Sequence, residues 1–101
     1  MSHSHEAPVA LAFDDDRVAE IVIRIVSEEA DTDPKEIARE SLLLELLDSL
    51  GVTEVVMALE DEFELSVPDA DIDRLRTVGD VIDYVRAELR KPRPVGTEPS
   101  R

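Results

Sequence analysis

Residues 47–63 constrain the fold more than any other part of this chain, because their apolar residues recur at helical spacing. One side of a helix over this stretch would carry Val52, Val55, Val56, Leu59 and Phe63. Such a stripe predicts a helix over about 49–64 that packs against a core. Asp48 and Ser49 stand at its start, and both residue types accept hydrogen bonds from the unpaired N–H groups of a first helical turn.

A second stripe on the same predicted helix mixes carboxylates with large apolar side chains. Its members are Leu50, Glu54, Met57 and Asp61. A helix face that only met water would not usually carry Leu and Met. This stripe therefore predicts a surface that other proteins contact.

The remaining helices follow from similar patterns. Apolar residues at i, i+3, i+4 spacing predict a helix over about 15–30, with acidic residues at its start. Pro34 opens a single turn, and Pro68 opens a short helix through about Asp73. Thr77 caps a last helix that ends near Arg90. The leucine-rich residues between 41 and 47 are expected to pin a long connection across the bundle.

These elements predict an all-α fold, a small four-helix bundle with three longer helices, one short helix and a long first loop. The helical domain is expected over residues 14–90. Residues 1–13 are expected to be a flexible leader, and the Pro-rich residues 91–101 a disordered tail.

Composition excludes several function classes. Asp and Glu number 25 against 11 Lys and Arg, which gives a formal net charge of −14. Such a surface repels nucleic acid and favours partners with basic patches, and it predicts a monomer. Cysteine is absent, so disulfides and thiolate catalysis are excluded. The longest apolar stretch is too short to span a bilayer, and no secretory signal is visible, so the expected location is the cytoplasm.

No catalytic or metal-binding group stands out. The two histidines, His3 and His5, lie in the predicted leader, where neither can act as a base for Ser49. Acidic residues at alternate positions resemble a calcium loop: Asp69, Asp71 and Asp73, followed by Asp80. Arg74 occupies the place where such a loop needs Gly, so a calcium-binding regulator ranks far below the other interpretations. We therefore predict neither catalytic residues nor a metal site.

Ser49 is chemically suited to carry a phosphodiester. It stands where a long loop meets a helix, so its hydroxyl is expected to be reachable from solvent. A phosphate attached there would meet unpaired backbone N–H groups and the positive end of the helix dipole.

The segments DSLGVTEVVMALEDEF and ELSVPDADIDRLRTVGDVIDYV resemble acyl carrier proteins, and the resemblance covers about residues 15–90. It implies that Ser49 bears 4′-phosphopantetheine, attached from coenzyme A by a phosphopantetheinyl transferase. It also implies that Asp48 flanks this arm. The implied docking face for partner enzymes consists of Leu50, Glu54, Met57, Glu60 and Asp61.

The function implied is that of a discrete, non-catalytic carrier. It would hold acyl groups as thioesters for fatty-acid or polyketide enzymes, namely acyltransferases, ketosynthases, reductases or acyl-activating ligases. Two alternatives stay open, an aminoacyl or peptidyl carrier and an unmodified acidic adaptor. The chain departs from the family pattern at Leu46 and Leu47, where a Gly commonly precedes the Asp-Ser pair, and at Gly51, where a polar residue is common. The aliphatic core between the helices could admit an acyl chain. Four residues that would lie near such a chain are interpreted as core residues rather than chain-binding residues, namely Val52, Val56, Leu59 and Ile72.

Overall fold

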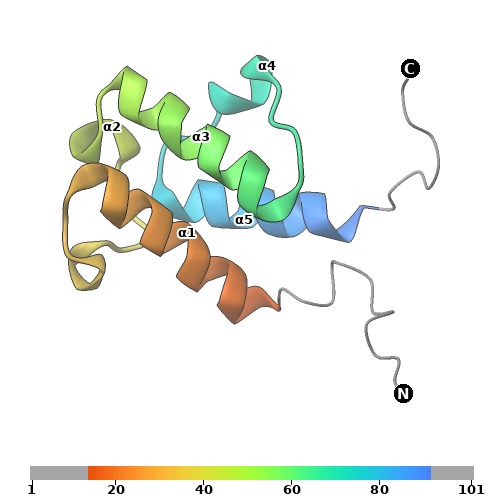
Figure 1. The fold of residues 1–101 in the computed structure, drawn as a ribbon, viewed down its shortest axis with the longest axis horizontal. Helices are drawn as coiled ribbons and strands as arrows, with labels where there is room; N and C mark the ends of the chain where they lie inside the picture. The colour runs from red at the N-terminus through yellow and green to blue at the C-terminus, as the bar shows by residue number, and fades with distance from the viewer. Residues whose placement is uncertain (1–13, 92–101) are drawn as a thin grey trace.

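The structure is a computed structural model that describes residues 14–91, and this part of the chain is helical (Figure 1). Its elements in chain order are α1 (Asp15–Ala30), the 3₁₀ turn η3 (Pro34–Glu36), α2 (Leu43–Leu46), α3 (Ser49–Phe63), α4 (Asp69–Ile72) and α5 (Val78–Arg90). The predicted leader and all but the first residue of the predicted tail lie outside the described residues. The three longer helices and the short α4 confirm the predicted all-α fold.

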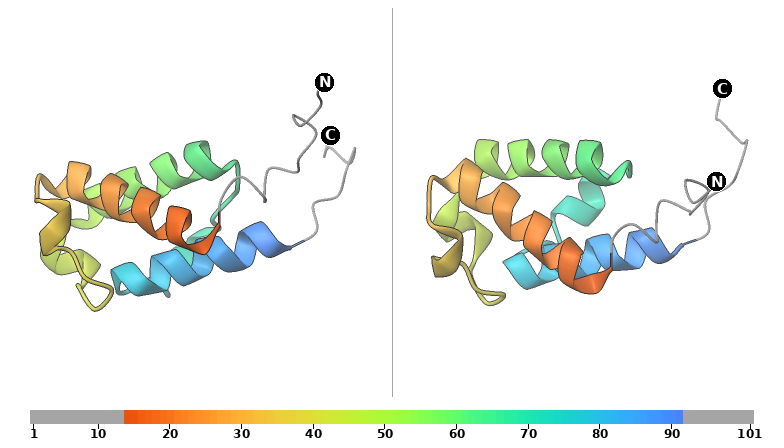
Figure 2. Two further views of the ribbon diagram at one scale, coloured as in Figure 1. Left: turned by 90° about the horizontal axis from the view of Figure 1, so that it is seen from below. Right: turned by 60° about the horizontal axis from the view of Figure 1, so that its bottom comes forward.

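Helix α1 lies between α3 and α5 and packs against both, as the two views of Figure 2 show. Its apolar stripe is buried over its whole length, from Val18 to Val26. The partners are the predicted stripe of α3 and the inward face of α5, and Phe63 is completely buried among them. The core is aliphatic apart from this one ring, as the scarcity of aromatic residues predicts. Among residues 14–91, no helix is long and apolar enough to cross a membrane.

The connection between α1 and α3 is more structured than the predicted long loop. The single turn expected after Pro34 is present as η3, but α2 was not predicted. Leu43 of α2 is buried in the core, and its N–H donates to the carbonyl of Arg76 at 2.9 Å. Leu42 also forms an isolated antiparallel bridge with Thr77. The leucines thus pin the connection as expected, and they do so by attaching it to the segment just before α5.

The start of α5 is stabilised by a capping box. The Thr77 hydroxyl accepts from the N–H of Asp80 at 3.0 Å, and the Asp80 carboxylate accepts from the N–H groups of Arg76 and Thr77 at 3.0 and 3.1 Å. These backbone donors, Arg76 first, lower the pKa of the Asp80 carboxyl below its ordinary value. The ionised carboxylate therefore stabilises the segment to which α2 is attached.

Asp80→Asn is expected to lower stability at neutral pH and to flatten the pH dependence of unfolding. A carboxyl whose pKa is lowered by folding stabilises the protein above its unfolded pKa of about 4, and this contribution disappears as pH falls through the folded value. Urea unfolding should therefore show that the free energy of unfolding decreases less in the variant than in the wild type between about pH 5 and pH 3. Asp69→Asn removes an equal charge from the exposed start of α4 and serves as control. Identical pH profiles for Asp80→Asn and the wild type would contradict the assignment.

Candidate functional site

Ser49 is the first residue of α3, and its side chain is exposed. Asp48 caps the helix, since its Oδ1 accepts from the N–H of Gly51 at 2.7 Å. Within the described residues, no hydrogen bond engages the Ser49 hydroxyl, although its carbonyl accepts from the Thr53 hydroxyl at 3.2 Å. Asp48 thus stabilises the helix start, while the Ser49 side chain is exposed to solvent, as the sequence predicted.

Gly51 allows the chain to pack closely at this helix start. It is buried, and a Cβ atom placed on it would lie 3.1 Å from the Leu47 Cβ and 3.3 Å from the Asp48 Oδ1. A larger residue would have to displace the core side chain of Leu47 or the capping carboxylate. From the sequence, Gly51 is only a departure from the family pattern that weakens the helix start. The structure adds a packing reason for its presence.

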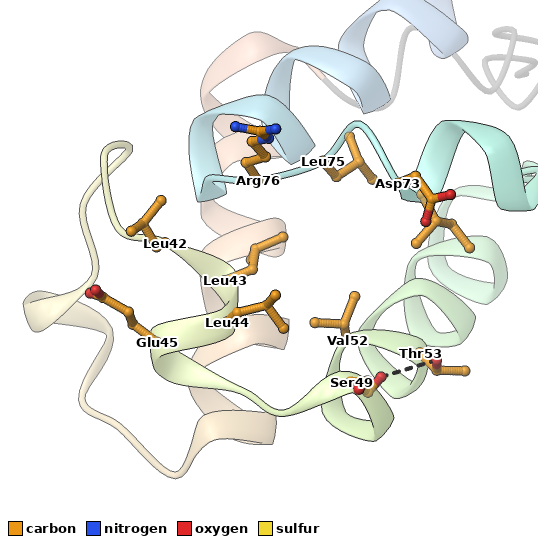
Figure 3. A pocket seen from close by; sticks show the side chains of 11 residues that line it. Leu42, Leu43, Leu44, Glu45, Ser49, Val52, Thr53, Asp73, Leu75 and Arg76 are labelled. Carbon is orange, nitrogen blue, oxygen red and sulfur yellow. Dashed lines mark hydrogen bonds between the residues drawn. The ribbon is translucent and has the colours of Figure 1, made fainter.

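A pocket of about 680 Å³ lies beside Ser49, between α2, α3 and the segment that joins α4 to α5 (Figure 3). Leu43 and Leu44 point into it from α2, and Val52 points into it from α3. Its other lining residues are Leu42, Glu45, Ser49, Thr53, Ile72, Asp73, Leu75 and Arg76. The volume falls within the range of about 300–1,000 Å³ that is typical of small-molecule sites, and its walls are mostly apolar.

Of the four residues that were interpreted as core near a possible acyl chain, two are buried and two are not. Val56 and Leu59 are buried as expected. Val52 and Ile72 are only partly buried and line the pocket instead. Helical periodicity does not separate these two cases, because it places a residue on the inward face without showing whether the space opposite is filled. Leu42 and Leu44, which are exposed at the pocket, were not predicted as site residues.

The predicted docking face is exposed. Leu50 and Met57 have 67% and 56% of their surface exposed to solvent. Such exposure is unusual for large apolar side chains on a helix that also contributes to the core. Glu54 and Asp61 are exposed beside them. Glu60 differs from these four residues because it is half-buried. Its Oε2 accepts from the N–H of Val67 at 2.9 Å.

Two of the four acidic residues that resemble a calcium loop have roles in the fold. Asp80 caps α5, and Asp71 accepts from the Tyr84 hydroxyl at 2.8 Å. Burial, this hydrogen bond and the charges of Glu88, Asp71 and Glu60 raise the pKa of Tyr84 above its ordinary value. Across residues 14–91, no three acidic or histidine side chains gather closely enough to hold a metal ion.

Comparison with known proteins identifies the family. Residues 20–85 match the family described as "Phosphopantetheine attachment site". The chain is 41% identical over 75 residues to an acyl carrier protein of Wolinella succinogenes, covering 72% of this chain and 91% of the relative. It is 39% identical over 76 residues to an acyl carrier protein of Clostridium acetobutylicum, covering 73% and 99%. The exposed serine at a helix start, the helical fold and these matches agree: the chain belongs to the acyl carrier proteins, whose members carry covalently attached 4′-phosphopantetheine.

Proposed function

We propose that Ser49 is the residue to which phosphopantetheine is attached. The observation that carries this proposal is the exposed, unengaged Ser49 hydroxyl at the N-terminus of a long helix, beside an apolar pocket. The other serines of the matched region have different settings. Ser27 is buried and donates to the Arg24 carbonyl at 2.9 Å, and the Ser41 Oγ accepts from the Ala38 N–H at 2.9 Å. Ser66 is exposed but lies between α3 and α4, away from any long helix start.

The first turn of α3 fits a phosphodiester at this position. Backbone N–H groups at a helix start point toward the preceding residues, and the helix dipole favours negative charge there. Asp48 already caps the N–H of Gly51, which leaves the earlier N–H groups of the turn for a phosphate. The bound group supplies the thiol that forms acyl thioesters, and the chain has no cysteine of its own. The role of this chain is then presentation, and partner enzymes supply the catalytic groups.

The pocket beside Ser49 is suited to shelter an aliphatic acyl chain. Its apolar walls are leucine, isoleucine and valine side chains from α2, α3, α4 and the segment before α5. The charged residues Glu45, Asp73 and Arg76 also line it. Each methylene that moves from water into such surroundings stabilises the complex by about 0.8 kcal/mol. The apolar part of the pocket therefore suits the aliphatic chain of a fatty-acyl or polyketide intermediate.

The exposed face of α3 is suited to brief contact with basic enzymes. Leu50 and Met57 offer apolar anchors, and Glu54 and Asp61 attract positive charge. We propose that a phosphopantetheinyl transferase and the acyl-handling enzymes of one pathway dock here, one after another, on a monomeric carrier. The cytoplasmic location stays a prediction from the sequence.

The test is the intact mass of the chain after incubation with coenzyme A and a broad-specificity phosphopantetheinyl transferase. A gain of one phosphopantetheine, with the modified peptide containing Ser49, is the expected result. An unchanged mass with several transferases would contradict the proposal and favour the unmodified adaptor. The leucines that precede Asp48, where the family commonly has Gly, would then be the first positions to vary.

Glu54→Lys is expected to slow association with the transferase by roughly 3- to 10-fold at low salt and to reduce the salt dependence of the rate. The charge change replaces attraction with repulsion on the docking face. Stopped-flow association at several salt concentrations measures both effects. Glu40→Lys makes the same charge change at an exposed position outside α3. Equal slowing by the two variants would indicate an effect of net charge alone and would contradict a local docking face.

A further inference from the structure

Helix α4 forms one wall of the pocket but is weakly attached to the bundle. Ile72 and Asp73 line the pocket from this side. None of the residues Asp69–Ile72 is buried, and no side chain caps the helix start. In the right-hand view of Figure 2, α4 lies between α3 and α5. A wall with so little buried surface depends on specific bonds to hold its position.

In the described part of the chain, two side-chain hydrogen bonds join residues 66–75 to the long helices. From α3, the Glu60 carboxylate accepts from the N–H of Val67 at 2.9 Å, just before Pro68 and α4. From α5, the Tyr84 hydroxyl donates to the Asp71 carboxylate at 2.8 Å. Val67 is itself buried, so the bond with Glu60 is partly shielded from water. Each long helix thus holds a different end of the wall.

Glu60 is also one of the five residues of the predicted docking face. It follows Met57 by three residues and directly precedes Asp61, so a partner that covers these two side chains lies within reach of it. Its side chain is half-buried rather than enclosed. An ion pair with a partner guanidinium or ammonium group would compete for the carboxylate that now accepts from the Val67 N–H, because charged donors form stronger hydrogen bonds than a backbone N–H.

We propose that Glu60 is a positioning residue that couples partner docking to opening of the pocket. In the free carrier, its carboxylate holds the segment before α4 against α3. When an enzyme docks, one of its basic side chains forms an ion pair with this carboxylate. The Val67 N–H then loses its acceptor, and the α4 wall moves away from α3. The Tyr84–Asp71 bond is untouched by this exchange and keeps α4 attached to α5. This inference rests on the proposed function for its purpose, which is release of the acyl chain to the docked enzyme.

The holding role is tested in the unmodified chain by hydrogen exchange of the backbone amides of residues 67–73. Glu60→Ala should make the Val67 amide exchange about 5- to 10-fold faster, as expected for the loss of one hydrogen bond. Glu60→Gln keeps an acceptor oxygen and should retain most of the protection. Asp61→Ala removes an equal charge from the same face and should leave Val67 unchanged. Unchanged exchange in Glu60→Ala would overturn the proposal.

The coupling is tested by adding a saturating phosphopantetheinyl transferase without coenzyme A. Amides 67–73 of the wild type should then exchange several-fold faster, although complex formation generally protects amides. Glu60→Gln should show no acceleration. Its neutral amide cannot form an ion pair with a basic side chain of the partner, but its oxygen still accepts from the Val67 N–H. Slower or unchanged exchange in the wild-type complex would overturn the coupling. These outcomes are independent of the mass shift, so a failure of the proposed modification at Ser49 is distinguished from a failure of this inference.

Discussion

Ser49→Ala is expected to abolish the mass gain on incubation with coenzyme A and transferase, because it removes the oxygen that accepts the phosphopantetheine group. Folding should be nearly unaffected. The side chain is exposed, and no hydrogen bond to its hydroxyl exists among the described residues. Asp48 rather than Ser49 caps α3. Substitutions at such surface positions usually change stability by no more than about 0.5 kcal/mol.

The measurement pairs intact mass with urea unfolding followed by circular dichroism. Ser66→Ala is the matched control, since it removes the other exposed serine of the matched region and should leave the mass gain intact. A mass gain that persists in Ser49→Ala and disappears in Ser66→Ala would reassign the attachment residue. A Ser49→Ala variant that no longer folds would show that Ser49 has a structural role as well, against the geometry described above.

Phe63→Ala is expected to lower the free energy of unfolding by about 3–5 kcal/mol, which is a large part of the 5–15 kcal/mol typical of a domain. Phe63 is completely buried near the end of α3 and is the one aromatic ring in a core of aliphatic side chains. Removing its ring leaves a cavity that surrounding valines and leucines fill only in part. Urea unfolding at neutral pH measures the change.

Leu50→Ala is the matched control for this stability effect. It truncates a large apolar residue on the same helix, but Leu50 is 67% exposed and contributes little to the core. Its stability should stay within about 0.5 kcal/mol of the wild type, while its association with the transferase weakens. Similar destabilisation by both variants would contradict the division of α3 into a core face and a docking face.

Most of the helical framework could be predicted from the sequence alone. Helices α1 and α5 begin and end within a residue of their predicted bounds, because Asp14, Thr77 and apolar periodicity act over a single turn or along one helix. The separation of Phe63 from Met57 on opposite faces of α3 is likewise a property of helical spacing. The position of Ser49 at a helix start follows from the Asp48 cap in the same way.

The tertiary structure decided the features that depend on residues far apart in the chain. Helix α2 was missed because Leu43 is held by the Arg76 carbonyl, 33 residues later, and no local pattern carries that information. Glu60 looks from its spacing like another docking residue, and only the folded chain brings the Val67 N–H to its carboxylate. The pocket beside Ser49 exists because α2, α3 and α4 leave the space between Leu44, Val52 and Ile72 unfilled. Periodicity determines which way a side chain points, but packing between distant segments determines what it meets.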